Sequence, residues 1–125
     1  MEKEDKELLL KELCARLPYK VKVEIISYTD ETSRPWFGEL SCKDLDCFIH
    51  DVAYKSIKPY LRPMSSMTEE ENKRFDDILT KMYYHEKSTL GDISDYLNSI
   101  HVDYRRLIEK GLAIEVTEQN NPYKD

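Results

Sequence analysis

The stretch that decides the fold is YKVKVEIISY, residues 19–28, in which apolar and polar residues alternate. Val21, Val23 and Ile25 fall on one side of an extended chain, because successive side chains of a strand point to opposite faces. The charged residues between them fall on the other side. This period of two predicts a β-strand with one buried face and one polar face.

The residues before this strand have the spacing of a helix. Between residues 4 and 17, apolar side chains recur three and four positions apart, and acid-before-base pairs such as Glu12 and Arg16 support the helix. Pro18 ends it, because the residue before a proline avoids helical geometry. The expected buried stripe consists of Leu9, Leu10, Leu13, Cys14 and Leu17.

Two further strands are predicted after the polar loop 29–35. Residues 36–40 restart an apolar run that suits an antiparallel partner strand, and residues 47–54 are expected to form a third strand. Residues 56–63 contain two prolines, which lack backbone donors. We therefore expect an extended crossover there, not a helix or an inner strand.

The second half of the chain has helical signals. Thr68 and Glu71 form a capping box, in which each side chain binds the backbone of the other residue. A second helix is expected after a cap at Ser88 or Thr89. The core-facing residues of the two helices are expected to be Phe75, Ile78, Leu79, Met82 and Tyr83, and then Leu90, Ile93, Leu97 and Ile100.

A short third helix is expected after a cap at Asp103. Gly111 stands at the position of a C-terminal helix cap, where φ > 0 is commonly required and glycine adopts it without a steric penalty. Residues 112–116 are then long enough for a short edge strand. These signals complete the predicted order of elements.

That order is α-β-β-β-α-α-α-β, and runs of strands followed by runs of helices favour a segregated α+β fold. We expect a small antiparallel sheet of about three to four strands, packed against N-terminal and C-terminal helices. A chain of 125 residues is typical of one domain. We assign residues 1–117 to this domain and the polar residues 118–125 to a flexible tail.

The charge and composition restrict the possible partners. The net charge is −6, and residues 68–125 hold 8 basic and 13 acidic side chains, which argues against a non-specific nucleic-acid coat protein. The three cysteines lack metal-ligand spacing, the N-terminus fits neither a signal nor a transit peptide, and no apolar run approaches the ~20 residues of a membrane span. We expect a cytoplasmic protein without a membrane segment.

Two stretches resemble a known group of sequences. KPYLRPMSSMTEEE, residues 58–71, and DYRRLIEKGLA, residues 103–113, are similar to an uncharacterised family of small proteins from gut bacteria and their prophages. The resemblance implies no activity, because the family has none assigned. Arg106 departs from it, since similar sequences tend to have glycine after the Tyr-Arg pair. A glycine needed there for φ > 0 would argue against a helix over 103–110.

Catalytic patterns are weak. Cys42 and Cys47 precede His50 closely enough for a Cys/His pair to be conceivable, but half-buried structural cysteines are the more common finding. His85-Glu86 and His101-x-Asp103 supply possible metal ligands without a spacing that joins the two pairs. We expect no enzymatic activity and no cofactor, and keep a metal-dependent enzyme as the third hypothesis.

Aromatic and arginine side chains are the best candidates for contact with a partner. Such pairs anchor protein interfaces and can also stack on bases and hold phosphates. A structural alternative is that Tyr60 and Leu61 fill the core while Arg62 pairs with an acidic helix residue. The candidate partner-binding residues are Trp36, Phe37, Tyr60, Arg62, Tyr104 and Arg105.

The leading hypothesis is a non-enzymatic accessory factor of prophage or mobile-element type that binds a protein partner. It depends on the missing catalytic pattern, the acidic balance and the resemblance. The second hypothesis is a nucleic-acid-binding module built on the small sheet. The two differ in salt dependence, because each neutralised phosphate releases counterions.

Overall fold

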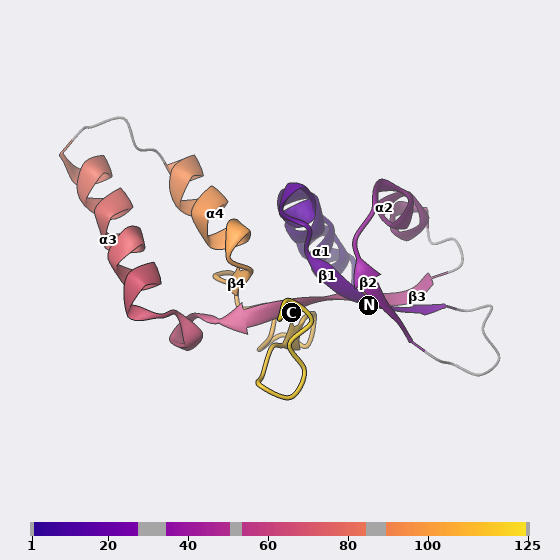
Figure 1. Cartoon of the computed structure of the whole chain (residues 1–125). Coiled ribbons are helices and arrows are strands. Elements are labelled where there is room, and N and C mark those ends of the chain that lie inside the picture. The colour runs from indigo at the N-terminus through magenta and orange to yellow at the C-terminus, as the bar shows by residue number, and fades with distance from the viewer. Residues whose placement is uncertain (1, 28–34, 51–53, 85–89, 125) are drawn as a thin grey trace.

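The chain has an α+β fold in a computed structural model that describes all residues except 1, 28–34, 51–53, 85–89 and 125. The described elements form a small mixed sheet and four α-helices (Figure 1). Short 3₁₀ turns cover Leu17–Tyr19 and Met64–Ser66. The helices are α1 (Lys3–Arg16), α2 (Cys42–Ile49), α3 (Glu69–Tyr83) and α4 (Leu90–Ser99), and the strands are β1 (Lys22–Ser27), β2 (Trp36–Glu39), β3 (Tyr54–Pro63), β4 (Val102–Asp103) and β5 (Ile114–Glu115).

The N-terminal helix and the first hairpin confirm the sequence prediction. Leu9 and Leu13 of α1 are fully buried, whereas Cys14, expected in the same stripe, is exposed. β1 and β2 pair antiparallel, with Val23 opposite Gly38 and Ile25 opposite Trp36. The apolar face of β1 packs in the same core cluster as α1.

The third strand predicted over residues 47–54 is wrong at its start, because residues 47–49 belong to α2; residues 51–53 lie outside the described residues, and Tyr54 is the first residue of β3. Ser41 and Asp44 form a capping box: the Asp44 amide donates to Ser41 Oγ (3.2 Å) and the Ser41 amide donates to Asp44 Oδ2 (3.0 Å). Leu45 and Phe48, one turn apart, are buried in the core. The capping box stabilises a short helix here, and this effect is stronger than the preference for a strand that the irregular alternation of apolar residues indicated.

The crossover predicted over residues 56–63 is also wrong, because β3 is an inner strand of the sheet. The Leu40 amide donates to Val21 O, so these two residues form a hydrogen-bonded pair at the end of the ladder between β1 and β2. Because bonded and non-bonded pairs alternate along an antiparallel ladder, Val23 also directs its N–H and C=O toward β2. Pro59 lies opposite Val23 on the other side of β1. Val23 therefore needs no hydrogen bond from an N–H at position 59. The second proline, Pro63, is the last residue of the strand.

The sheet is mixed, whereas the sequence predicted an antiparallel one. β3 pairs antiparallel with β1 and parallel with β4 and β5. Figure 1 shows α1 and α2 over one face of the sheet, the C-terminal segment on the opposite face, and α3 and α4 beside the far end of β3. A second core cluster joins α4 and β4 to Met67 and Phe75.

The predicted capping box of α3 is confirmed. The Glu71 amide donates to Thr68 Oγ1 (3.1 Å), and the Thr68 amide donates to Glu71 Oε1 (2.9 Å). Ile78 is buried as expected, but Tyr83 at the helix end is exposed. In α4, Leu97 is buried as expected. The predicted caps Ser88 and Thr89, and the side chains of Met82 and Leu90, lie outside the described part.

The helix predicted over residues 103–110 is wrong, and turns replace it. Arg106 has φ of 61°, which no α-helix accommodates, so the argument against a helix based on that position is correct. Asp103 still acts as a cap, since its two carboxylate oxygens accept the amides of Leu107 (3.0 Å) and Ile108 (2.9 Å). Gly111 has φ of 74°, as its predicted cap position requires.

Candidate functional site

The edge of the sheet formed by β2 presents two adjacent aromatic side chains to solvent. Trp36 is 51% exposed and Phe37 is 55% exposed. Among the described residues, β2 pairs with β1 and with no other strand. We call β2 with these two side chains the aromatic edge.

The two aromatic side chains lie on opposite faces of the sheet. Trp36 lies opposite the buried Ile25, on the side of α1 and α2, and its indole covers Gly38 two residues along the strand. A Cβ at Gly38 would collide with that ring. The glycine therefore gives the indole a place against the backbone while leaving its outer side in solvent.

Phe37 lies on the other face, next to Tyr60 of β3. The two ring centroids are 6.2 Å apart at an interplanar angle of 46°. Tyr60 itself is only 7% exposed, so it supports Phe37 and offers little surface of its own. Two of the predicted contact residues, Trp36 and Phe37, are therefore on the surface, and Tyr60 lies beneath Phe37.

Tyr123, in the C-terminal segment, forms hydrogen bonds with the backbone of β1 and of β3 at Tyr60. The Tyr123 hydroxyl donates to Tyr60 O (2.7 Å) and accepts from the Lys22 amide (3.0 Å). Its ring stacks on His101 with centroids 3.8 Å apart. Burial, with Arg16 and Arg62 nearby, lowers the pKa of His101 to about 4, so the stacked imidazole is neutral at pH 7. Tyr123 lies within residues 118–125, the segment predicted to be a flexible tail.

Arg62 forms part of an internal clamp. Its guanidinium donates to both Glu71 carboxylate oxygens (2.6 and 2.8 Å), and also to Ile100 O (3.2 Å) and Ser66 O (3.0 Å). The hydrogen bonds from Arg62 lower the pKa of Glu71 to about 2. The structural alternative is confirmed: Tyr60 and Leu61 are buried, and Arg62 joins β3 to α3 and to Ile100, the residue after α4.

Tyr104 and Arg105 face a charged cluster inside the molecule. Arg105 Nε lies 3.3 Å from Glu12 Oε2, and Arg16 Nε donates to Glu12 Oε1 (2.6 Å). The guanidinium carbons of Arg16 and Arg105 both lie 5.4 Å from the centroid of the Tyr104 ring. Glu12 and Arg16 are fully buried. In the sequence, the i,i+4 spacing of Glu12 and Arg16 indicated only a pair that stabilises the helix. No local sequence pattern shows that β4 covers this pair in the folded chain.

In the described part of the chain, no hydrogen bond joins His50 to Cys42 or to Cys47, which is partly buried. Cys42 and His50 are exposed at opposite ends of α2, and His50 Nδ1 lies 3.2 Å from Asp46 Oδ1. Asp103 is occupied by two backbone amides. His85 and Glu86 lie outside the described residues. In the described part, no three His, Cys, Asp or Glu side chains are grouped for a metal ion.

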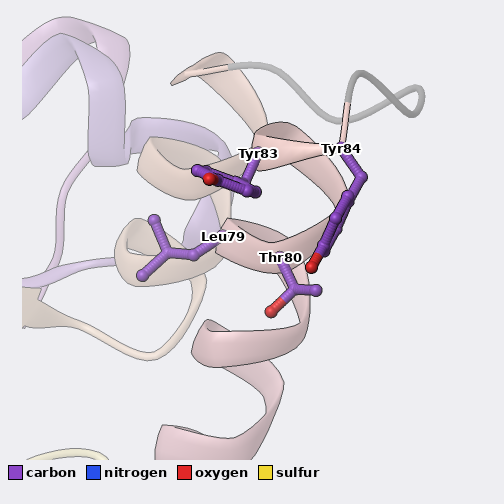
Figure 2. A pocket seen from close by; sticks show the side chains of 4 residues that line it. All are labelled: Leu79, Thr80, Tyr83 and Tyr84. Carbon is purple, nitrogen blue, oxygen red and sulfur yellow. The ribbon is translucent and has the colours of Figure 1, made fainter.

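A hollow of about 520 Å³ opens beside the last turns of α3. Leu79, Thr80, Tyr83 and Tyr84 line it, and Figure 2 shows Tyr83 near Leu79 and Tyr84 near Thr80. Tyr83 and Tyr84 meet edge to face with ring centroids 5.1 Å apart. Tyr83 is the last residue of α3, and the Tyr84 amide donates to Thr80 O (3.1 Å), so the backbone donors of this second exposed aromatic pair are already used in helical hydrogen bonds.

The six predicted contact residues thus separate into three places: the aromatic edge with Tyr60 beneath it, the Arg62 clamp, and the cluster around Glu12. None of the described helices is both long and apolar enough to cross a membrane. A scan against protein-family models and searches of curated proteins and of solved structures found no match to this chain.

Proposed function

We propose that the protein is a non-enzymatic factor that binds a protein chain through the aromatic edge. One observation carries this proposal: Trp36 and Phe37 are adjacent, each about half exposed, on a strand that pairs on one side only among the described residues. Large aromatic side chains dominate the binding energy of many protein interfaces. A partner strand added at β2 would contact one aromatic ring on each face of the sheet.

The state of the arginines favours a protein partner over a nucleic acid. Arg62 and Arg105 were the cations expected to hold phosphates, and they are paired with Glu71 and Glu12. Phosphate binding would have to break these pairs and leave carboxylates beside the polyanion. The net charge of −6 also favours a protein partner over a nucleic acid.

We extend the proposal to an accessory role in a prophage or mobile element, within the cytoplasm. It is supported by the resemblance of residues 58–71 and 103–113 to small proteins of that origin. Such a role needs an exposed contact surface and no catalytic group.

Site-specific photocrosslinking tests the proposed function. A benzophenone amino acid is placed at position 37 and, in a control protein, at the exposed Tyr84 just after α3. After irradiation in native lysate, with and without nuclease, we expect a discrete nuclease-insensitive protein adduct at position 37 and none at position 84. Equal labelling at both positions, or adducts that disappear with nuclease, would contradict the proposal.

A further inference from the structure

The backbone of β2 has a defined outward side. The Leu40 amide donates to Val21 O (2.9 Å). Because antiparallel pairs alternate between bonded and non-bonded positions, Gly38 also directs its N–H and C=O at β1. Phe37 and Glu39, one residue out of phase, direct theirs away from β1. The outer edge of β2 therefore offers the donors and acceptors of these two residues.

From this pattern we infer that the aromatic edge pairs with β2 of a second copy of this chain, antiparallel about a two-fold axis at Phe37. The inference rests on the proposed function, because it names the partner of the same edge. A two-fold antiparallel contact requires a self-complementary patch. In this register Phe37 of each copy bonds to Phe37 of the other through both outward groups, and each Glu39 amide donates to Pro35 O of the other copy.

Proline at the start of the strand can take part in this register as an acceptor. Pro35 has no N–H, so it accepts the Glu39 amide of the other copy and leaves the Glu39 carbonyl there without a donor. Glu39 then lies opposite a proline and not opposite another carboxylate. The pairing thus satisfies both outward groups of Phe37 and the amide of Glu39 without bringing like charges together.

The side chains also match across the two-fold axis. On one face Phe37 of each copy lies directly opposite Phe37 of the other, and each ring leans over β1 toward its own Tyr60. On the other face Trp36 lies opposite Gly38 of the second copy, whose own indole covers that glycine. The two indoles are then side by side, and both exposed aromatic residues of the edge become covered.

A charge-swap experiment tests the inference, because only a residue on the two-fold axis faces its own copy. Phe37→Lys and Phe37→Glu are purified separately, and their masses are measured by sedimentation across a concentration series. We expect the wild-type protein to dimerise, and each variant alone to show a dissociation constant raised about tenfold or more by like-charge repulsion. An equimolar mixture of the two variants should recover a one-to-one dimer.

Matched controls separate this effect from misfolding. Tyr84→Lys and Tyr84→Glu carry the same charges at an exposed position just beyond α3 and should dimerise like the wild-type protein. Circular dichroism should show unchanged folding of the Phe37 variants, since that side chain is 55% exposed.

Three results would overturn the inference: a monomeric wild-type protein at high micromolar concentration, a monomeric mixture, or tighter association of Phe37→Lys alone. The last would place Glu39 of the partner opposite position 37. If the wild-type protein is monomeric but position 37 crosslinks a different protein in lysate, the self-pairing fails and the edge remains a binding surface. No adduct at position 37 would overturn the proposed function as well.

Discussion

At the scale of single residues, Arg106 adopts a backbone conformation that favours glycine. Its φ of 61° places the Cβ close to the following carbonyl oxygen. We predict that Arg106→Gly is more stable than Arg106→Ala by about 1 kcal/mol, because both lose the exposed side chain and only glycine relieves this contact. Urea denaturation of the two variants measures the difference, and equal midpoints would contradict the prediction.

Gly111 provides the reverse experiment. Its φ is 74°, and nothing lies within 4 Å of a Cβ built there, so Gly111→Ala changes the backbone energy without a collision. The substitution should lower the free energy of unfolding by about 1 kcal/mol. Together, the substitutions at Arg106 and Gly111 measure the free-energy cost of the left-handed backbone conformation at these two positions.

Gly38 controls the position of the single tryptophan. Because a Cβ at Gly38 would collide with the indole of Trp36, we predict that Gly38→Ala moves the ring away from the strand and into water. The expected result is a red shift of the intrinsic fluorescence. Gly111→Ala, at a position with no neighbour within 4 Å, is the control and should leave the spectrum unchanged. An unshifted Gly38→Ala spectrum would show that the indole does not rest on the glycine.

The pair Arg62–Glu71 gives the stability a defined pH dependence. The pKa of Glu71 is lowered from 4.5 to about 2, so the pair's contribution is complete above pH 4.5 and is lost as the pH falls through 2. At pH 7 we predict that Glu71→Gln loses about 3 kcal/mol of unfolding free energy, a difference that shrinks to near zero by pH 2.

Glu70→Gln is the matched control, because Glu70 lies exposed in the same first turn of α3. It should change stability little at any pH. Thermal melts of the three proteins between pH 7 and pH 2 make the comparison. A Glu71→Gln deficit that persists unchanged at pH 2 would show that the ion pair is not its source.

At the scale of elements, the strength of the local signal decided how well each segment could be predicted. The alternation around Val23 and the capping box at Thr68 are local, and both elements formed. β3 could not be predicted, because Pro59 is tolerated only by the alternation of hydrogen bonds between β1 and β2. That alternation belongs to the assembled sheet and leaves no trace in residues 56–63.

The Tyr123 hydroxyl group links the C-terminal segment to two strands of the sheet. Tyr123 bridges Lys22 N and Tyr60 O, so Tyr123→Phe leaves the amide and the carbonyl without this partner. We predict a loss of about 1–3 kcal/mol in the free energy of unfolding, measured by urea denaturation. Tyr84→Phe, whose ring is 67% exposed, should be neutral. Equal stability of the two variants would contradict the role given to Tyr123.

At the scale of the whole molecule, the candidate site could be predicted only in part. Trp36 and Phe37 were identified from their residue types, and both are exposed. Arg62 and Arg105 were chosen for the same reason, but their partners Glu71 and Glu12 lie 9 and 93 residues away in the sequence. Such ion pairs form only when α1, α3 and β3 are assembled. Sequence pattern therefore identified candidate side chains, and packing determined which of them remain available.

The central claim is that the outer side of β2 receives another strand, and residue-resolved amide exchange tests it most directly. Phe37 and Glu39 direct their amides outward, whereas Gly38 and Leu40 bind β1. As protein concentration rises, we predict that exchange at Phe37 and Glu39 slows and that Gly38 and Leu40 are protected throughout. Exchange at Phe37 and Glu39 that stays fast at every concentration, with no slowing in the presence of lysate proteins, would contradict the claim.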